Sequence, residues 1–325
     1  MVKVAVIGSG AAVEAHLEAW SRIDRAVVTG VSGKDANGLR EVSDRGGVAC
    51  FDSLSDLLAQ ADVDVVDVCG PGLWFREPIR QAVRAGKSVI CEGPLSANVK
   101  DTNELIDLCE QHGVQVYTGH LLRFSPEYVD AHQQVENGAI GKPGVFRLSR
   151  SMPNPGESSL SVGNQDLFLT VGAGEWDWLR WTLGEVKRVM ARRVKHSSVE
   201  YALTTLRMED GTVVHVELSR SECVSESSFE LAGDQGMISH NSNESTPVRL
   251  KTSQESSVGL VQTEDLLVKS PLQRWLEHVA NCLSGGEKSI GSTEDARKAV
   301  EIAEAVIQSA EAGKPVSIGG KGEAK

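Results

Sequence analysis

The chain has 325 residues, of which 40% are hydrophobic and 24% charged, enough for one large or two medium globular domains. Its formal net charge is −12, from 45 acidic and 33 basic residues. Binding to a polyphosphate requires clustered Lys and Arg that replace counterions, so this balance disfavours a nucleic-acid partner. We therefore expect a small-molecule partner.

The spacing of the cysteines and the first residues of the chain bear on the expected cellular location. The six cysteines form no C-x-x-C pair and no Cys/His cluster with zinc spacing, so we expect reduced thiols, no disulfide framework and no metal. The apolar stretch 2–7 runs directly into Gly8 and is too short for a signal sequence or a membrane span. The expected location is cytoplasmic, away from membranes.

Residues 1–122 alternate short apolar runs with helical segments. Strands are expected at 2–7, 26–31, 63–69, 88–91 and 114–118, and helices at 13–23, 54–60, 77–85 and 101–112. Two of these helices run into Gly86 and Gly113, the residue type that ends a helix in the left-handed conformation. The alternation predicts an α/β fold whose first domain is a Rossmann-type, doubly wound parallel sheet.

The order of expected helices and strands changes in residues 123–325. A helix is expected at 126–137, strands at 144–150, 186–193, 201–208, 213–219 and 228–233, and two final helices at 272–283 and 293–312. The turn Glu209-Asp210-Gly211 indicates a hairpin. The polar stretches 154–165, a candidate lid, and 240–257 are interpreted as loops. This half is predicted to be an α+β domain with a mostly antiparallel open sheet.

A glycine loop joins the first expected strand to the first helix. Its sequence is Gly8-Ser9-Gly10-Ala11-Ala12-Val13. Backbone N–H groups at such a helix start can receive a pyrophosphate, although Val13 stands where a third glycine would serve close helix packing. The alternative is that the glycines serve only a tight turn.

The end of the second strand bears on the choice of dinucleotide. The run there is Val31-Ser32-Gly33-Lys34, with no carboxylate to bind the ribose 2′-hydroxyl of NAD. A small hydroxyl and the Lys34 cation suit a 2′-phosphate, so NADP is the first choice and NAD the second. Alternatively, Lys34 is an ordinary solvated lysine.

Several longer stretches resemble the glucose-fructose oxidoreductase, inositol dehydrogenase and MocA (Gfo/Idh/MocA) family over nearly the whole chain. They lie at 63–71, 85–95, 119–126, 138–143 and 177–184. The resemblance implies a Rossmann domain, a second domain that presents substrate to the nicotinamide, and a homodimer or homotetramer packed through the second sheet. It also implies cofactor contacts at Gly70, Pro71, Glu92, Gly93 and Pro94.

The proton-handling positions of that family are altered. Its catalytic lysine, in a Glu-Lys-Pro motif, is Gly93 here, and its Asp and His are Thr170 and Gly174. Such groups typically contribute ~10²-fold or more to a rate. Glu175 and His120 are the remaining candidates for acid–base work, while Glu92 is expected to face the cofactor.

Recognition of the substrate also departs from the family. A family histidine is Phe75 here, and Trp74, Phe75 and Trp176 are candidates to line a pocket more apolar than a sugar site. Arg123 is expected to anchor the domain junction or an anionic substrate group. The predicted function is an NAD(P)-dependent oxidoreductase with an atypical active site. The alternatives are a catalytically silent dinucleotide-binding homologue or partner subunit, and a non-redox use of bound NAD(P).

Overall fold

A computed structural model describes residues 1–33, 36–70, 75–153, 166–196, 199–221, 225–244, 248–252, 256–259 and 269–319. Residue contacts group the chain into two compact units. Unit 1 comprises Met1–Phe124 with Lys269–Val300, and unit 2 comprises Ser125–Val268 with Glu301–Lys325. The sequence suggests a single boundary between residues 122 and 123, whereas the contacts return residues 269–300 to unit 1.

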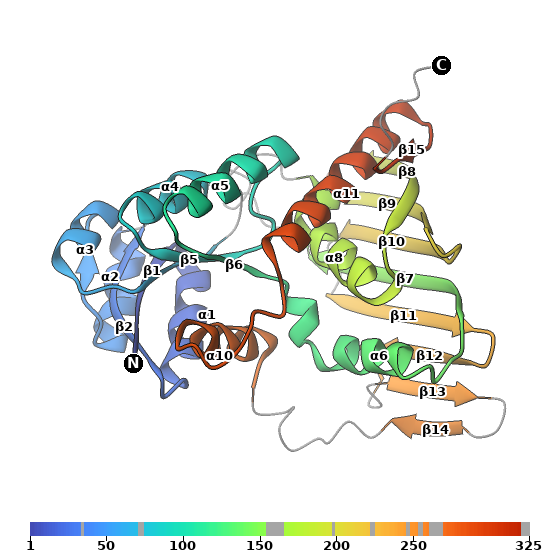
Figure 1. The fold of residues 1–325 in the computed structure, drawn as a ribbon, viewed down its shortest axis with the longest axis horizontal. Helices are drawn as coiled ribbons and strands as arrows, with labels where there is room; N and C mark the ends of the chain where they lie inside the picture. Colours follow the sequence, from blue (N-terminus) through green and yellow to red (C-terminus); the bar gives the residue numbers. More distant parts are fainter. Residues whose placement is uncertain are drawn as a thin grey trace. The chain divides into compact units, whose positions relative to one another are not determined.

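Unit 1 is built on a parallel sheet. Its strands are β1 (Val2–Gly8), β2 (Ala26–Gly33), β3 (Cys50–Phe51), β4 (Val65–Val68), β5 (Ser88–Glu92) and β6 (Val116–Gly119). They pair in the order β3-β2-β1-β4-β5-β6, all parallel (Figure 1). The predicted doubly wound sheet is confirmed, with the order reversing between β1 and β4.

Helices cover both faces of this sheet. They are α1 (Gly10–Ser21), α2 (Ala36–Gly46), α3 (Leu54–Gln60), α4 (Arg76–Arg84), α5 (Val99–Gln111) and α10 (Pro271–Leu283). Val4 and Val6 of β1 belong to a core shared with α1 and α10, while Ala5 and Ile7 belong to one shared with α3, α4 and α5 (Figure 1). Burial on both faces explains why the strands read as continuous apolar runs.

One helix of unit 1 is absent from the sequence-based expectation. Helix α2 follows β2, and Leu39, 2% exposed, is its apolar contact with the core. The other residues of α2 are mostly polar, so its sequence carries little helical periodicity of apolar residues. In contrast, the predicted glycine ends of α4 and α5 are confirmed, because Gly86 and Gly113 have φ of 70° and 65°.

Unit 2 contains a second, larger sheet. Its strands are β7 (Pro143–Pro153), β8 (Val186–His196), β9 (Val199–Met208), β10 (Val213–Ser221), β11 (Glu226–Gly233), β12 (Gly236–Asn241), β13 (Val248–Thr252), β14 (Ser256–Gly259) and β15 (Val316–Ser317). The order is β14-β13-β12-β11-β7-β10-β9-β8-β15, and β10 with β7 is the parallel pair. The mostly antiparallel sheet is confirmed, as is the hairpin of β9 and β10 around Gly211.

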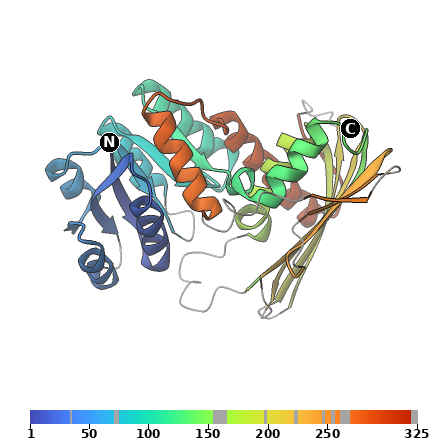
Figure 2. The same cartoon turned by 90° about the horizontal axis from the view of Figure 1, so that it is seen from below.

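Helices of unit 2 lie on one face of this sheet (Figure 2). They are α6 (Pro126–Glu136), α7 (Leu167–Thr170), α8 (Gly172–Leu183) and the C-terminal part of α11 (Thr293–Ala312). Beneath them Tyr128, Phe146, Trp178 and Phe229 pack ring against ring, with centroids 5.2 to 6.0 Å apart. This aromatic cluster holds α6 and α8 to β7 and β11.

The prediction that residues 240–257 form a loop is wrong for those of them that the structure describes. Strand β12 extends to Asn241, and β13 and β14 pair antiparallel at the edge of the sheet. Val248 is fully buried while Arg249 beside it is exposed. A short strand at the edge of a sheet buries side chains on one face only, so few of its residues are apolar and its sequence resembles that of a loop. The candidate lid at 154–165 lies outside the described residues.

Candidate functional site

The carboxyl ends of the parallel strands bring together most of the predicted cofactor residues. Gly8 at the end of β1 pairs with Gly33 at the end of β2, and Glu92 at the end of β5 pairs with Gly119 of β6. Gly70 follows β4 with φ of 122°, a conformation that glycine adopts readily. In open α/β sheets, ligands bind at this edge, where the strand order reverses.

The N-terminus of α1 lies at that edge without a side-chain cap. Ser9 is the N-cap residue, in extended conformation (φ −148°, ψ 145°), and its side chain makes no hydrogen bond to the helix start. The first turn, which includes Ala11 and Ala12, carries no acidic residue. Unsatisfied N–H groups and the positive end of a 12-residue helix suit an anion. The residues therefore fit the pyrophosphate of a dinucleotide.

Close backbone packing explains the glycines. A Cβ on Gly33 would lie 1.8 Å from the carbonyl oxygen of Gly8, and a Cβ on Gly8 would lie 2.5 Å from that of Cys69. Val13, at the position of the missing third glycine, is fully buried and would contact that Gly8 Cβ at 2.8 Å. The loop thus retains its tight approach with a valine in the third place. Ser32 is 1% exposed, so its hydroxyl is not at the surface.

A buried ion cluster lies directly behind the loop. His16 of α1 is within 2.8 Å of Asp67 of β4 through Nδ1 and within 2.8 Å of Glu92 of β5 through Nε2. Trp20 Nε1 donates to the same Asp67 Oδ2 at 2.7 Å. The side chains of His16 and Asp67 are 1% and 0% exposed, whereas that of Glu92 is 32% exposed. The cluster therefore connects the helix core to the open edge of the sheet.

Both ring nitrogens of His16 face carboxylates. Ionised carboxylates only accept hydrogen bonds, so each nitrogen must donate one and the ring carries both protons. Burial by itself lowers the pKa of His16, but the charges and hydrogen bonds of Asp67 and then Glu92 raise it to about 10. His16 is consequently an imidazolium at neutral pH.

Next to this cluster, Gly93 leaves an open position. The residue is exposed, and a Cβ built there would lie 3.3 Å from Thr118 Cγ2. Pro94, which follows, is buried. A side chain at 93 is thus sterically admissible after a shift of a few tenths of an ångström.

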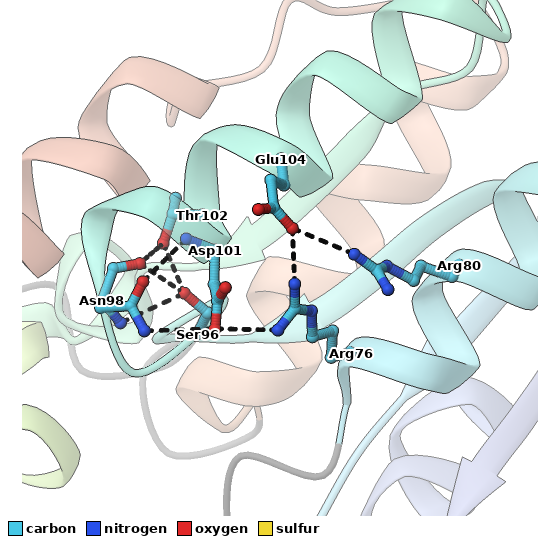
Figure 3. A network of polar contacts seen from close by, with 7 residues as sticks. All are labelled: Arg76, Arg80, Ser96, Asn98, Asp101, Thr102 and Glu104. Carbon is cyan, nitrogen blue, oxygen red and sulfur yellow. Dashed lines mark hydrogen bonds and ion pairs between the residues drawn. The ribbon is translucent and has the colours of Figure 1, made fainter.

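A polar network fixes the chain beyond Pro94 (Figure 3). Asn98 caps α5 by accepting from the Asp101 N–H at 2.8 Å. Arg76 of α4 pairs with Asp101 at 3.0 Å, and Arg80 pairs with Glu104 at 3.1 Å. These contacts hold the segment after the Glu92-Gly93-Pro94 turn against α4.

In unit 2, the resemblance assigns the family Asp and His positions to Thr170 and Gly174. Thr170, the last residue of α7, accepts a hydrogen bond from Arg220 of β10. Gly174 is partly exposed in the first turn of α8. Arg220 lies directly opposite Glu200 across the β9–β10 pair. The Arg220 guanidinium therefore donates a hydrogen bond to the residue at which the resemblance implies a carboxylate.

The neighbouring candidates Glu175 and Trp176 are buried. Glu175, 1% exposed, accepts from Arg150, which also donates to the Tyr128 hydroxyl at 2.7 Å. Burial raises the pKa of Glu175, and Arg150 opposes that rise. Trp176 is fully buried and donates from Nε1 to the Phe168 carbonyl at 2.8 Å. Both side chains are committed to the interior of unit 2.

Three further candidates lie inside unit 1. His120 is 6% exposed and packs beside Gly291. Arg123 is 4% exposed, donates to the Ile290 carbonyl at 3.0 Å and pairs with Asp295 at 3.4 Å. Phe75 precedes α4 and is 3% exposed in the core. The roles predicted for them stay predictions. Lys34, Pro71 and Trp74 lie outside the described residues.

Sequence reasoning missed His16 and Asp67. His16 is one polar residue in an amphipathic helix, and Asp67 interrupts the apolar run of β4. A charged residue within a buried parallel strand requires a partner, and that signal was available. Its partner could not be named, because the two residues are 51 positions apart.

Two negative findings concern the described chain. None of its helices is long and apolar enough to cross a membrane. Its His, Cys, Asp and Glu side chains form no group of three or more that could hold a metal ion.

Comparisons with known proteins agree with this architecture. A family model for the oxidoreductase family with an NAD-binding Rossmann fold matches residues 2–120, and one for the GFO/IDH/MocA C-terminal domain matches residues 128–239. The uncharacterized oxidoreductase YrbE of Bacillus subtilis is 25% identical over 96% of this chain and 95% of its own. The myo-inositol 2-dehydrogenase of Thermotoga maritima is 29% identical over 76% of this chain and 78% of its own.

A solved structure extends the likeness to the whole fold. A probable dehydrogenase from Thermotoga maritima superposes with a TM-score of 0.82 at 26% identity, covering 97% of this chain and 98% of the other. The parallel sheet with its glycine loop, the second sheet and the matched models agree. The chain therefore belongs to the GFO/IDH/MocA family of oxidoreductases, whose first domain is an NAD-binding Rossmann fold.

Proposed function

We propose that this oxidoreductase is an NAD(P)-dependent dehydrogenase or reductase that moves a hydride to or from the carbonyl or hydroxyl carbon of a small metabolite. One observation carries the proposal: the uncapped start of α1 and the partly exposed carboxylate of Glu92 lie at the same edge of the parallel sheet. Residues Gly8 to Ala12 would hold the dinucleotide, whose nicotinamide supplies the hydride chemistry. The chain then has to supply position and a proton path.

NADP is the first-choice dinucleotide and NAD the second. Support for NADP comes from the end of β2, where Ser32 and Gly33 provide no carboxylate for a ribose 2′-hydroxyl. Because Ser32 is buried, a 2′-phosphate would have to be bound by backbone N–H groups or by other side chains.

The names of the relatives support a broad class of substrate, small sugars and polyols. The Thermotoga relative is named a myo-inositol 2-dehydrogenase, which makes cyclic polyols the first compounds to try. An aromatic pocket is a narrower proposal that now depends mainly on Trp74, since Phe75 and Trp176 are buried in cores.

The competing proposal is a catalytically silent dinucleotide-binding protein or partner subunit. Gly93, Thr170 and Gly174 favour it, because three proton-handling positions of the family are changed together. Non-redox use of a bound NAD(P) is the third candidate.

Fluorescence titration with NADPH and NADH tests the first step. Binding of either dinucleotide supports the proposal, and tighter binding of NADPH supports the NADP preference. Failure to bind either at millimolar concentration would refute all three candidates. Absorbance at the reduced-nicotinamide band, followed with a panel of inositols, aldoses and hydroxy acids, then separates an enzyme from a silent homologue.

We further propose assembly as a homodimer or homotetramer through the helix-free face of the second sheet. Val194, Tyr201 and Leu203 point away from the buried residues of β8 and β9 and are 66%, 49% and 52% exposed. Exposed apolar side chains clustered on a flat sheet are typical of an interface. Light scattering coupled to size exclusion measures the assembly state.

A further inference from the structure

The cluster of Asp67, His16 and Glu92 is asymmetric. Asp67 is fully buried and its Oδ2 accepts from both His16 and Trp20. Glu92 accepts from His16 through Oε1 alone, and within the described residues no hydrogen bond reaches its Oε2. One end of the cluster is therefore sealed and the other is open to solvent at the sheet edge.

The charges of the cluster favour an available carboxylate on Glu92. The imidazolium of His16 carries one positive charge, and buried Asp67 supplies one negative charge against it. The thiols of Cys69 and Cys91 lie nearby, but burial and the adjacent carboxylates raise their pKa values, so they add no charge at neutral pH. Because Asp67 already faces His16 as a counter-charge, Glu92 is not the sole partner of the imidazolium and meets it through Oε1 alone.

Glu92 adjoins the position that lacks its expected side chain. Gly93 can contribute no ammonium or hydroxyl, and the next residue, Pro94, is buried and has no donor. Glu92 is thus the ionisable side chain of this turn, held by His16 at 2.8 Å. A general acid or base needs such a fixed position before its proton affinity matters.

Building on the proposed function, we infer that Glu92 exchanges the proton with the substrate hydroxyl, and that His16 and Asp67 are positioning residues that hold it and balance its charge. In the oxidation direction the substrate C–H bond breaks and its electron pair leaves as hydride to the nicotinamide of NAD(P)+. The O–H proton passes to the Glu92 carboxylate, and the C–O bond becomes a double bond. The Glu92 carboxylic acid then releases its proton to water through its exposed side.

A purely structural ion cluster is the alternative explanation. It would tie α1 to β4 and β5, and its loss would lower stability without affecting proton exchange at the cofactor edge. The test therefore needs a readout of protons as well as of folding.

Calorimetric titration provides that readout without a substrate. The heat of binding of NADPH and of NADP+ is measured at pH 6 to 7 in two buffers of different ionisation enthalpy, which gives the protons taken up with each dinucleotide. A positive nicotinamide favours ionised Glu92 and a neutral dihydronicotinamide favours the acid. The wild type should take up more protons with NADPH than with NADP+. The 2′-phosphate titrates equally in both and cancels in the difference.

Two variants make the measurement specific. Glu92→Gln keeps the shape and the acceptor to His16, and it should abolish the difference in proton uptake. Glu18→Gln is the matched control and should leave the difference unchanged, because Glu18 is an exposed carboxylate of α1, the helix of His16, and pairs with Arg22. An equal difference in wild type and Glu92→Gln, or no difference in wild type, would overturn the inference while leaving the proposed function intact. Absence of dinucleotide binding would instead refute the proposed function, and the inference with it.

Turnover adds a second readout once a substrate is found. Glu92→Gln should lower kcat by about 10²-fold or more with KM nearly unchanged. Asp67→Asn removes a negative charge near Glu92, so the acid limb of the pH profile should move down by about one pH unit. A fall in stability with an unmoved pH profile would assign Asp67 a structural role only.

Discussion

His16 and Asp67 form a buried ion pair between helix and sheet, with Nδ1 and Oδ2 2.8 Å apart and neither side chain more than 1% exposed. Charged side chains buried this deeply are stable in the interior only as a pair, because an isolated charge there is strongly unfavourable. With Glu92 on the other ring nitrogen, His16 is the shared cation of two carboxylates.

Stability should fall as pH rises toward 10. The pKa of His16 is raised from 6.5 to about 10 by Asp67 and Glu92 against the effect of burial. Above pH 6.5 the folded state holds a proton that the unfolded state has lost, so the stabilisation is complete below pH 6.5 and disappears as pH passes 10. Urea unfolding from pH 6 to 10 measures it.

His16→Gln should be less stable than wild type by about 3–5 kcal/mol at pH 6, because Asp67 is left without its cation. The gap should narrow toward pH 10. His112→Gln, at an exposed histidine, is the control. A gap that stays constant with pH would contradict an imidazolium at position 16.

Gly33→Ala should disrupt the dinucleotide loop. Its Cβ would overlap the Gly8 carbonyl oxygen at 1.8 Å, so β1 and β2 must separate at their ends. We expect a loss of at least tenfold in NADPH affinity by fluorescence titration, together with lower thermal stability. Gly46→Ala is the control, since its Cβ would meet only Val48 Cγ2 at 3.8 Å. Unchanged affinity would show that the loop does not bind the pyrophosphate.

Gly93→Lys should fold normally, since its Cβ meets Thr118 Cγ2 at an adjustable 3.3 Å. Combined with Gly174→His, it introduces the two side chains that the resemblance implies at these positions. Because we place the proton step on Glu92, the double variant should oxidise inositols and aldoses no faster than wild type. Activity that rises from none to measurable would instead identify a decayed dehydrogenase.

Arg150→Met should destabilise unit 2 by about 3–5 kcal/mol, because it leaves the carboxyl of Glu175 buried without its cation. Glu175→Gln should have a smaller effect on unfolding in urea, since the amide still accepts from Arg150. If Glu175 were the proton carrier, Glu175→Gln would lose about 10²-fold in kcat with little change in stability. Unfolding midpoints and kcat, measured together, separate these roles.

Leu203→Glu should dissociate the assembly proposed for the open sheet face, as seen by light scattering. The matched control is Ile290→Glu, at a similarly exposed apolar residue of unit 1 (45% against 52% exposed). Dissociation by both variants, or by neither, would argue against an interface on this face.

Local patterns in the sequence were sufficient for the main architecture. Continuous apolar runs such as those of β1 and β4 predict strands buried on both faces, and Gly86 and Gly113 mark helix ends by their freedom of φ. The glycine loop at Gly8 predicts a dinucleotide site, because the groups that would bind a pyrophosphate are backbone N–H groups of neighbouring residues. Where apolar periodicity is weak, as in α2 and in the edge strands β13 and β14, the sequence was not sufficient.

The cluster behind the loop was decided only by the tertiary structure. His16, Asp67 and Glu92 come from α1, β4 and β5, and sequence spacing says nothing about which side chains meet across a sheet. Likewise, the sequence alone allowed Glu175 to be an acid or base, and folding placed it against Arg150. Residue type specifies which groups can carry a proton. Burial and charge partners, which long-range packing sets, decide whether such a group is available at the site or committed to the core.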